Sequence, residues 1–311
     1  MLDSFLMVGQ NVLTLFILIA VGLLCGRARL LGEPAVKGLA NLALYIATPC
    51  VIVKSCIREF DPAMLRGFLL VIAVAAANHA LLILVARLVF RDRDEDRCRL
   101  FRFATVFSNA GYMALPLQQA LLGDDGVFYC AAYIIVFNVL LWTYGAWEVS
   151  GDRRTLSPKG ILLNPGVIGV AVGLVLFLFS VPVPPLVKDA VGHLASLNTP
   201  LPMFIVGYYL GQTDILRALR DGRSYVCMVL RLVGMPLVAL GALLLCGVRG
   251  TVLVSLMICI STPVATACTM FATRYDRAPT LSVNLVSIST LLSVVTMPVL
   301  VALSDWLGRV L

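Results

Sequence analysis

Two apolar segments of this chain are interrupted by residues that could bind a small ligand. The segments run over residues 103–116 and 257–267. Their interruptions consist of small, polar and proline residues: Ser108, Asn109, Gly111 and Pro116 in the first, and Thr262 and Pro263 in the second. Where a helix resumes after such a break, its first N–H groups lack partners and its end carries partial positive charge. These residue types therefore predict a binding site for an anion, most simply a carboxylate, with Asn109 as its main side chain.

The apolar sequence around these breaks indicates what must surround them. Both segments are apolar enough to enter a bilayer, and both place their polar residues near its expected midplane. Backbone groups without partners cost several kcal/mol each in hydrocarbon, so such breaks persist only beside a cavity or inside protein. A pair of broken helices in the two halves of a chain is typical of the binding site of a secondary transporter, which is the class of protein that we expect here.

The composition predicts an all-α integral membrane protein. Of the 311 residues, 60% are hydrophobic and 13% are charged, and apolar stretches of membrane-spanning length recur along the chain. We expect ten transmembrane helices, at residues 5–25, 36–57, 64–90, 99–121, 126–149, 162–181, 187–211, 223–246, 250–273 and 279–304. The connectors between these spans leave no room for a soluble domain.

Basic residues mark one side of the predicted membrane protein. Seventeen lysines and arginines fall in the odd-numbered connectors and five in the even-numbered ones. The positive-inside rule therefore places the odd connectors in the cytoplasm and both termini outside, in a multi-pass protein of the cell membrane. The net charge of +7 then reflects the cytoplasmic connectors, whose expected partner is anionic lipid rather than nucleic acid. The first apolar segment lacks a basic start and a cleavage site, so we expect a retained span.

Ten spans divide into two sets of five, which predicts that the second half inserts upside down relative to the first. The two inverted repeats would be residues 1–149 and 162–311, joined by a short cytoplasmic linker at residues 150–161. Three similarities recur at an offset of 151–153 residues: Thr48-Pro49 with Thr199-Pro200, Ser108-Asn109 with Ser261-Thr262, and His79 with Arg231. Proline removes an amide donor, so Pro49 and Pro200 are expected to kink or unwind the second and seventh spans. The broken fourth and ninth spans are expected to cross near the membrane midplane.

Several of these segments resemble the auxin efflux carrier family. The resemblance covers the chain from end to end and rests on three motifs: residues 108–117 with Gly123-Asp124-Asp125-Gly126, residues 41–50, and residues 289–298. It implies a bile-acid-transporter-like fold of ten helices, with crossed fourth and ninth helices and elevator-type alternating access. The long central cytoplasmic loop of plant members is nearly absent here, so the chain is similar to the bacterial type.

The same resemblance implies a substrate class and a role for one residue. Bacterial relatives are mostly associated with malonate, malate and similar carboxylates, and plant relatives with the auxin indole-3-acetate. Asn109 matches the crossover asparagine that contacts the substrate carboxylate in plant carriers, whereas Thr262 stands in place of any amide side chain in the ninth span. A small organic anion is thus the expected partner, and a homodimer is compatible with the family.

Four single residues and one group of prolines each keep more than one interpretation. Arg231 lies deep in the eighth span without a carboxylate at its depth; it could bind carbonyl groups, extend to the inner interface or meet the anionic substrate. His79 could relay protons or be a structural histidine, and Lys54 could attract anions at the outer mouth or extend to the surface. Asn109 itself could bond a neighbouring helix. Four prolines could line a cavity or act as kinks: Pro49, Pro116, Pro200 and Pro263.

No cofactor or metal site is expected. The nine cysteines are scattered without a C-x-x-C pair, and Asp124-Asp125 has no further ligands in its flanks. The coupling ion is open between H⁺ and Na⁺. The alternative functions are a sodium-coupled, bile-acid-like organic anion symporter and a membrane sensor or channel on the same fold. An enzyme is not expected, because the two histidines lie far apart in sequence and no acidic cluster has metal-ligand spacing.

Overall fold

The structure is a computed structural model that describes residues 2–91, 94–155, 158–211 and 222–310. The α-helices are α1 (Leu2–Arg27), α2 (Glu33–Leu42), α3 (Thr48–Cys56), α4 (Pro62–Val89), α5 (Glu95–Val106), α6 (Leu115–Leu140), α7 (Ala146–Ser150), α8 (Pro158–Leu162), α9 (Pro165–Leu178), α10 (Pro185–Ser196), α11 (Pro200–Leu210), α13 (Gly222–Val229), α14 (Met235–Leu245), α15 (Gly250–Ser261), α16 (Ala267–Arg274) and α17 (Pro279–Val310). Short π-helices join some of them: η1 (Ala43–Ala47), η2 (Ala110–Ala114), η3 (Leu141–Gly145) and η5 (Leu230–Gly234). A 3₁₀ turn, η4, covers Arg153–Thr155. Part of the predicted linker and three connector arginines, Arg93, Arg217 and Arg220, lie outside the described residues.

Six helical segments of the described chain are long and apolar enough to cross a membrane. They are Gly9–Arg27, Glu33–Cys56, Pro62–Val89, Ala110–Ser150, Gly222–Leu245 and Pro279–Val310, and two shorter apolar helices are Pro165–Leu178 and Gly250–Ser261. Large apolar side chains such as Leu13, Leu69 and Leu84 are exposed on these helices, as expected where lipid rather than water covers the surface. The protein is therefore an all-helical membrane protein. Its division into ten spans and two inverted repeats stays a prediction.

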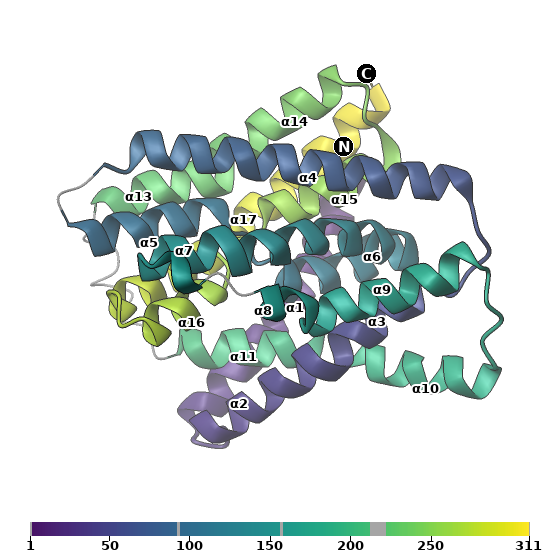
Figure 1. Cartoon of the computed structure of the whole chain (residues 1–311), viewed down its shortest axis with the longest axis horizontal. Coiled ribbons are helices and arrows are strands. Elements are labelled where there is room, and N and C mark those ends of the chain that lie inside the picture. Colours follow the sequence, from purple (N-terminus) through teal and green to yellow (C-terminus); the bar gives the residue numbers. More distant parts are fainter. Residues whose placement is uncertain (1, 92–93, 156–157, 212–221, 311) are drawn as a thin grey trace.

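Two sets of packed helices can be followed through the molecule. The first set comprises α1, α2, α3, α9, α10 and α11, and the second comprises α4, α5, α6, α13, α14, α15 and α17. Figure 1 shows α2, α3, α10 and α11 along the lower edge of the view and α4, α13 and α14 along the upper edge. The sets touch where α1 packs against α17 and α3 packs against α6. Both interrupted segments belong to the second set.

The two Thr-Pro pairs affect their helices differently. At Pro49 the helix stays continuous, because α2 passes through η1 into α3 and the Thr48 N–H donates to Ala43 O. Before Pro200 the helix is interrupted, since α10 ends at Ser196 and α11 begins at Pro200. A π-turn shifts the hydrogen-bond register by one residue, which accommodates the missing proline donor without a break.

The first set is closely packed where α1 meets α11. A Cβ atom added at Gly207 would lie 2.0 Å from Ile19 O, and one added at Gly22 would lie 2.5 Å from Phe204 O. Only a residue without a side chain allows backbones to approach so closely, and small residues commonly mediate such contacts between membrane helices. These two glycines therefore fix the distance between α1 and α11.

Basic side chains gather where the connectors after α4, α7 and α16 meet. We call this the basic end and define it by Arg87, Arg99, Arg102, Arg274 and Arg277. Arg277 joins two of the connectors by pairing with Asp96 at 2.6 Å. The buried Glu148 carboxylate forms ion pairs with Arg102 at 3.3 Å and with Arg87 at 3.6 Å. The neighbouring Arg99 guanidinium holds the pKa of the exposed Glu95 carboxyl below its usual range.

Candidate functional site

The two interrupted segments lie against each other and are joined by their backbones. Ser108 and Val264 form an isolated antiparallel bridge. The Asn109 N–H donates to Pro263 O at 2.8 Å, and the Ala265 N–H donates to Phe107 O at 3.0 Å. These bonds satisfy backbone groups that the breaks release from their helices. We call this pair of segments, residues 107–109 and 262–266, the crossover.

Four helix ends meet at the crossover. α5 ends at Val106 and α15 at Ser261, and the following residues are extended, with ψ of 116° at Phe107 and 152° at Thr262. The chain resumes as η2 at Ala110, which continues into α6, and as α16 at Ala267. The first N–H groups of a helix have no intrahelical acceptor and carry partial positive charge. The resumed helices thus direct two positive ends toward one place, which suits an anionic group.

Asn109 occupies the start of one of these resumed helices. It is the residue before η2, and its side chain makes no capping hydrogen bond. The side chain is 3% exposed, and its Nδ2 atom has no hydrogen-bond partner. Buried amide groups are nearly always hydrogen-bonded, so an unpaired donor of this kind calls for a ligand or an ordered water. Asn109 therefore carries a buried, unpaired donor at the crossover, and its role as a ligand-binding residue stays a prediction.

A cavity of about 680 Å³ leads from Asn109 to the basic end. At the crossover it is lined by Asn109, Gly111, Thr266 and Ala267, and at the other extremity by Glu33, Lys37 and Arg274. Between them its wall is largely apolar, with Ile134, Phe137, Leu141, Trp142, Ile205 and Met270. The cavity is therefore polar and electropositive at the crossover, and most of its remaining wall is apolar. Since Glu33 and Lys37 are 63% and 67% exposed, the cavity reaches solvent-accessible side chains.

The structure brings some of the predicted site residues to this cavity and not others. Asn109 and Gly111 line it. Three crossover residues support it from behind without lining it: Ser108, Thr262 and Pro263, all of them buried. Pro116 is buried in the first turn of α6. Pro49 and Pro200 are partly buried at the starts of α3 and α11, and they too lie outside the lining.

The segments that carry the two Thr-Pro pairs, Thr48-Pro49 and Thr199-Pro200, nevertheless contact each other. The Thr48 hydroxyl donates to Asn198 Oδ1 at 3.0 Å, and both residues are buried. Asn198 directly precedes the Thr199-Pro200 pair, and Thr48 also lines the cavity. This bond joins η1 and α3 to the interruption between α10 and α11, so it fixes one wall of the cavity opposite the crossover.

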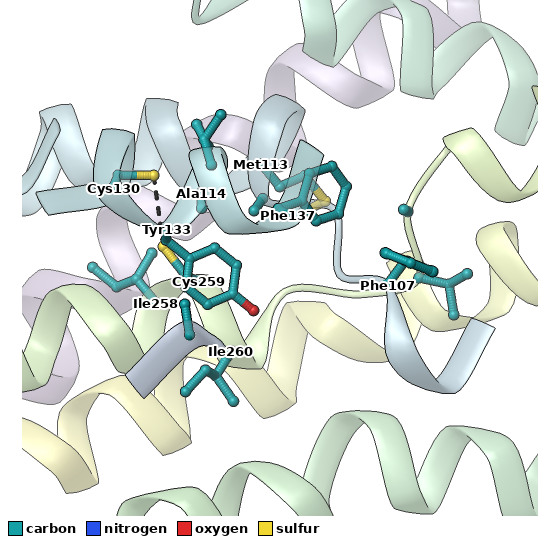
Figure 2. Packing of buried hydrophobic residues seen from close by; sticks show 14 of the residues in the cluster. Phe107, Met113, Ala114, Cys130, Tyr133, Phe137, Ile258, Cys259 and Ile260 are labelled. Atoms are coloured by element: carbon teal, nitrogen blue, oxygen red, sulfur yellow. Dashed lines mark hydrogen bonds between the residues drawn. The ribbon is translucent and has the colours of Figure 1, made fainter. Parts of the chain in front are cut away.

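Arg231 lies at the crossover but not in the cavity. Its side chain is fully buried on η5. Nη2 donates to Ile260 O at 2.8 Å and to Thr262 O at 3.0 Å, and Nε donates to Thr262 O at 3.3 Å. Of the three interpretations given for Arg231, the structure shows the binding of carbonyl groups. Figure 2 shows the surroundings, with Ile260 at the end of α15 and the Tyr133 hydroxyl pointing away from the two sulfurs of Cys130 and Cys259.

His79 is buried near Arg231. Its Nδ1 atom bonds Ala75 O at 2.8 Å, which makes Nδ1 the protonated nitrogen because a carbonyl oxygen can only accept. Its ring lies 5.4 Å from the Tyr133 ring, and Nε2 has no partner. His79 and Arg231 are close enough to interact electrostatically. His79 does not line the cavity, so a role in proton relay stays a prediction.

Lys54 lies away from the cavity. Its ammonium group is 3.7 Å from the Asp124 carboxylate, and Arg58 pairs with the neighbouring Asp125. Gly123, with φ of +62°, interrupts α6 just before these acids, and such a conformation favours glycine. Asp124 and Asp125 therefore pair with two basic residues, one at the end of α3 and one just after it. Attraction of anions by Lys54 stays a prediction.

Other cavity residues were not singled out in the sequence. Tyr112 and Trp142 line the wall, as do the amides Asn41 and Asn138. The signal that could have found Asn41 and Asn138 is an amide inside an apolar span, the same signal that marks Asn109. The aromatic residues carry no such signal, because apolar spans contain many of them. Within the described part of the chain, no three His, Cys, Asp or Glu side chains gather as metal ligands.

Comparison with known proteins relates the chain to membrane transport proteins. A family model described as "Membrane transport protein" matches residues 7–158 and 154–301. An uncharacterized transporter of Methanothermobacter thermautotrophicus is 24% identical over 297 residues, covering 93% of this chain and 96% of the relative. An uncharacterized transporter of Methanocaldococcus jannaschii is 23% identical over 308 residues, covering 95% and 97%.

A plant protein is also similar over part of its length. The "Probable auxin efflux carrier component 5c" of Oryza sativa subsp. japonica is 29% identical over 161 residues, which are 50% of this chain and 42% of that protein. The family model covers nearly the whole chain, and the interrupted helices, crossover and cavity have the form expected of a transporter. The chain therefore belongs to the membrane transport protein family, that of the auxin efflux carriers.

Proposed function

We propose that this protein is a secondary transporter that carries small organic carboxylates, malonate-like, malate-like or auxin-like, across the membrane. One observation supports this most directly: the unpaired Nδ2 donor of Asn109 lies at the crossover, at the inner end of an accessible cavity. A carboxylate placed there accepts from Asn109 Nδ2 and from the first free N–H groups of η2 and α16. Such charge-assisted bonds are stronger than neutral ones.

The cavity wall provides for the rest of the substrate. Ligand pockets commonly measure about 300–1,000 Å³ and combine an apolar lining with a few polar groups. The cavity of about 680 Å³ falls in this range. Its apolar wall favours a substrate with an apolar body over a compact dicarboxylate, although both have a carboxylate for Asn109.

Alternating access completes the proposal. The broken helices belong to the second helix set, and the Thr48–Asn198 contact belongs to the first, so a sliding of one set against the other would carry the crossover across the membrane. In the ten-span, inverted-repeat topology the basic end is cytoplasmic, both termini are outside, and the cavity described here faces inward. Anionic lipid would bind the basic end, a homodimer is compatible with the family, and the coupling ion would be H⁺ or Na⁺.

Uptake into proteoliposomes tests this function. Radiolabelled malonate, malate and indole-3-acetate are offered to the wild type, to Asn109→Ala and to the control Asn78→Ala, with and without sodium or pH gradients. We expect saturable uptake that falls roughly tenfold or more in Asn109→Ala, because a hydrogen bond to a charged group is worth about 1.5–3 kcal/mol. Asn78, on α4, also has a buried Nδ2 atom without a partner but does not line the cavity, so its variant should retain most uptake.

Two results would contradict the proposal. Equal uptake by the wild type and Asn109→Ala would remove Asn109 from the site. Absence of uptake of all three compounds by the wild type would overturn the substrate class. The gradients identify the coupling ion, since the driving gradient must accelerate uptake in the wild type.

A further inference from the structure

Arg231 brings a full positive charge into the interior of the protein. Its side chain is fully buried, and its Nη1 atom has no hydrogen-bond partner. The groups of the described chain that interact with it electrostatically are the Tyr133 hydroxyl, the Cys227 thiol and the His79 imidazole, and none of them is a carboxylate. Removing an ion from water costs several kcal/mol even after the protein relaxes, unless an opposite charge compensates it. The structure must therefore supply this compensation in another way.

The end of α15 supplies part of it. Arg231 donates three hydrogen bonds to Ile260 O and Thr262 O, which are carbonyls released where α15 ends at Ser261. The carboxyl end of a helix carries roughly half a negative charge. About half of the guanidinium charge is thus left without a counterpart among the described residues.

This remaining charge lies directly behind the binding position. Thr262, which accepts from Arg231, precedes Pro263, whose carbonyl accepts from the Asn109 N–H at 2.8 Å. Asn109 faces the cavity, whereas Arg231 is absent from its lining. One extended strand therefore separates the guanidinium from the place where a substrate carboxylate would lie. Because residues 262–264 of this segment are buried, the charge acts across it with less screening than in water.

We propose that Arg231 is a positioning residue that makes the crossover selective for anions, holding the ninth-span break in place and providing the positive charge that an anionic substrate neutralises. This inference rests on the proposed function, because it concerns the same site. Arg231 does not touch the substrate; it acts through the Ile260–Thr262 carbonyls and through its field. An uncharged ligand of the same shape gains nothing from this charge and binds more weakly.

The test compares an anion with its uncharged isostere. Acetate and acetamide are the probes, because acetate is a minimal carboxylate that any carboxylate site accepts. Shifts of the thermal midpoint of the purified full chain, at constant ionic strength, give apparent dissociation constants for both probes. The variants are Arg231→Gln, which removes the charge, Arg231→Lys, which keeps it, and Lys54→Gln, which removes an equal charge from a partly exposed ion pair remote from the cavity.

We expect the wild type, Lys54→Gln and Arg231→Lys to prefer acetate. In Arg231→Gln this preference should fall on the order of tenfold, the effect of a unit charge about 10 Å away at an effective dielectric of about 20. Acetamide affinity should change little. A purely structural role predicts instead that Arg231→Gln weakens acetate and acetamide alike, and that result would overturn the inference.

The remaining outcomes also decide between the two views. If Arg231→Gln does not fold, Arg231→Lys settles the point, because loss of the acetate preference despite a retained charge contradicts the charge role. If the wild type binds acetate no better than acetamide, that result also contradicts the charge role. Failure of the proposed function looks different: acetate is preferred and the preference depends on Arg231, yet malonate, malate and indole-3-acetate are not transported.

Discussion

Asn109 directly precedes η2, and its side-chain amide nitrogen has no hydrogen-bond partner. Its backbone N–H is used by Pro263 O, so the residue is fixed by the crossover rather than by its side chain. The buried Nδ2 donor is consequently left without a partner in the protein. Gly111, two residues later, lies in the same wall, and a Cβ atom added there would meet nothing within 4 Å. In the proposed site, the residue before the helix would bind the carboxylate, and the first turn of the helix leaves space for it.

Filling this space should block the site without unfolding the protein. We predict that Gly111→Leu lowers carboxylate uptake about tenfold or more while the thermal midpoint stays close to that of the wild type, because the new side chain projects into the cavity and leucine favours helix over glycine. The control is Gly241→Leu, since Gly241 also has open space around it and lies on α14 outside the cavity. Normal uptake by Gly111→Leu would place the substrate elsewhere.

At the scale of elements, close contacts between helices fix the position of one cavity wall. α1 and α11 approach at Gly22 and Gly207, and α11 contributes Ile205 and Leu210 to the cavity wall. The Thr48–Asn198 hydrogen bond then joins the start of α3 to the turn before α11. The wall opposite the crossover is thus closely packed, as the proposed alternating access requires of a helix set that would stay fixed.

A side chain at Gly207 should separate α1 from α11. We predict that Gly207→Ala lowers the thermal midpoint by several degrees, because a Cβ atom 2.0 Å from Ile19 O forces the backbones apart and overpacking typically costs about 1–3 kcal/mol. Gly9→Ala, on α1 with nothing within 4 Å of the new Cβ atom, should leave it unchanged or raise it. Equal midpoints for the two variants would mean that the contact is not tight.

The sequence predicts where helices are interrupted better than it predicts which distant segments pack against the interruptions. Both interruptions lie where the sequence predicts them, since Asn109 and Pro263 stand inside apolar stretches where a helix has no other reason to end. The same Thr-Pro pair, however, gives a continuous helix at Pro49 and an interruption before Pro200. Packing differs between the two sites: a Cβ atom at Gly169 of α9 would lie 2.8 Å from Pro49 Cα. Such long-range contacts leave no local pattern.

The same limit applies to the site. The donor role of Asn109 follows from residue type and position, but the partners of Arg231 are carbonyls about thirty residues away that exist only once α15 has ended. The cavity wall combines residues from distant elements, among them Trp142, Ile205 and Met270. In an apolar sequence nothing distinguishes these residues from lipid-facing ones, so the wall could not be predicted.

For the whole molecule, the direction of the cavity matters most. It extends from the crossover to Arg274 at the basic end, and the positive-inside rule assigns such an end to the cytoplasm. The described structure would then be the inward-facing state of the carrier, with the ion pairs of Lys54 and Arg58 at the opposite end.

Thiol labelling measures this direction. We predict that Thr269→Cys, in the cavity wall, reacts with a membrane-impermeant maleimide in inside-out vesicles and reacts several-fold more slowly in right-side-out vesicles, because in the proposed topology the cavity opens toward the cytoplasm. The wild type provides the background of the native cysteines, most of which are buried. Faster labelling in right-side-out vesicles would reverse the orientation.

Counterflow tests the central claim, carriage of a carboxylate by alternating access, most directly. Proteoliposomes are loaded with unlabelled indole-3-acetate or malonate, diluted into a trace of the labelled compound, and followed in time. The account predicts transient accumulation of label above equilibrium in the wild type, saturating with internal substrate and lost in Asn109→Ala. Label that only equilibrates, at a rate independent of the internal substrate, would contradict a carrier and indicate a channel.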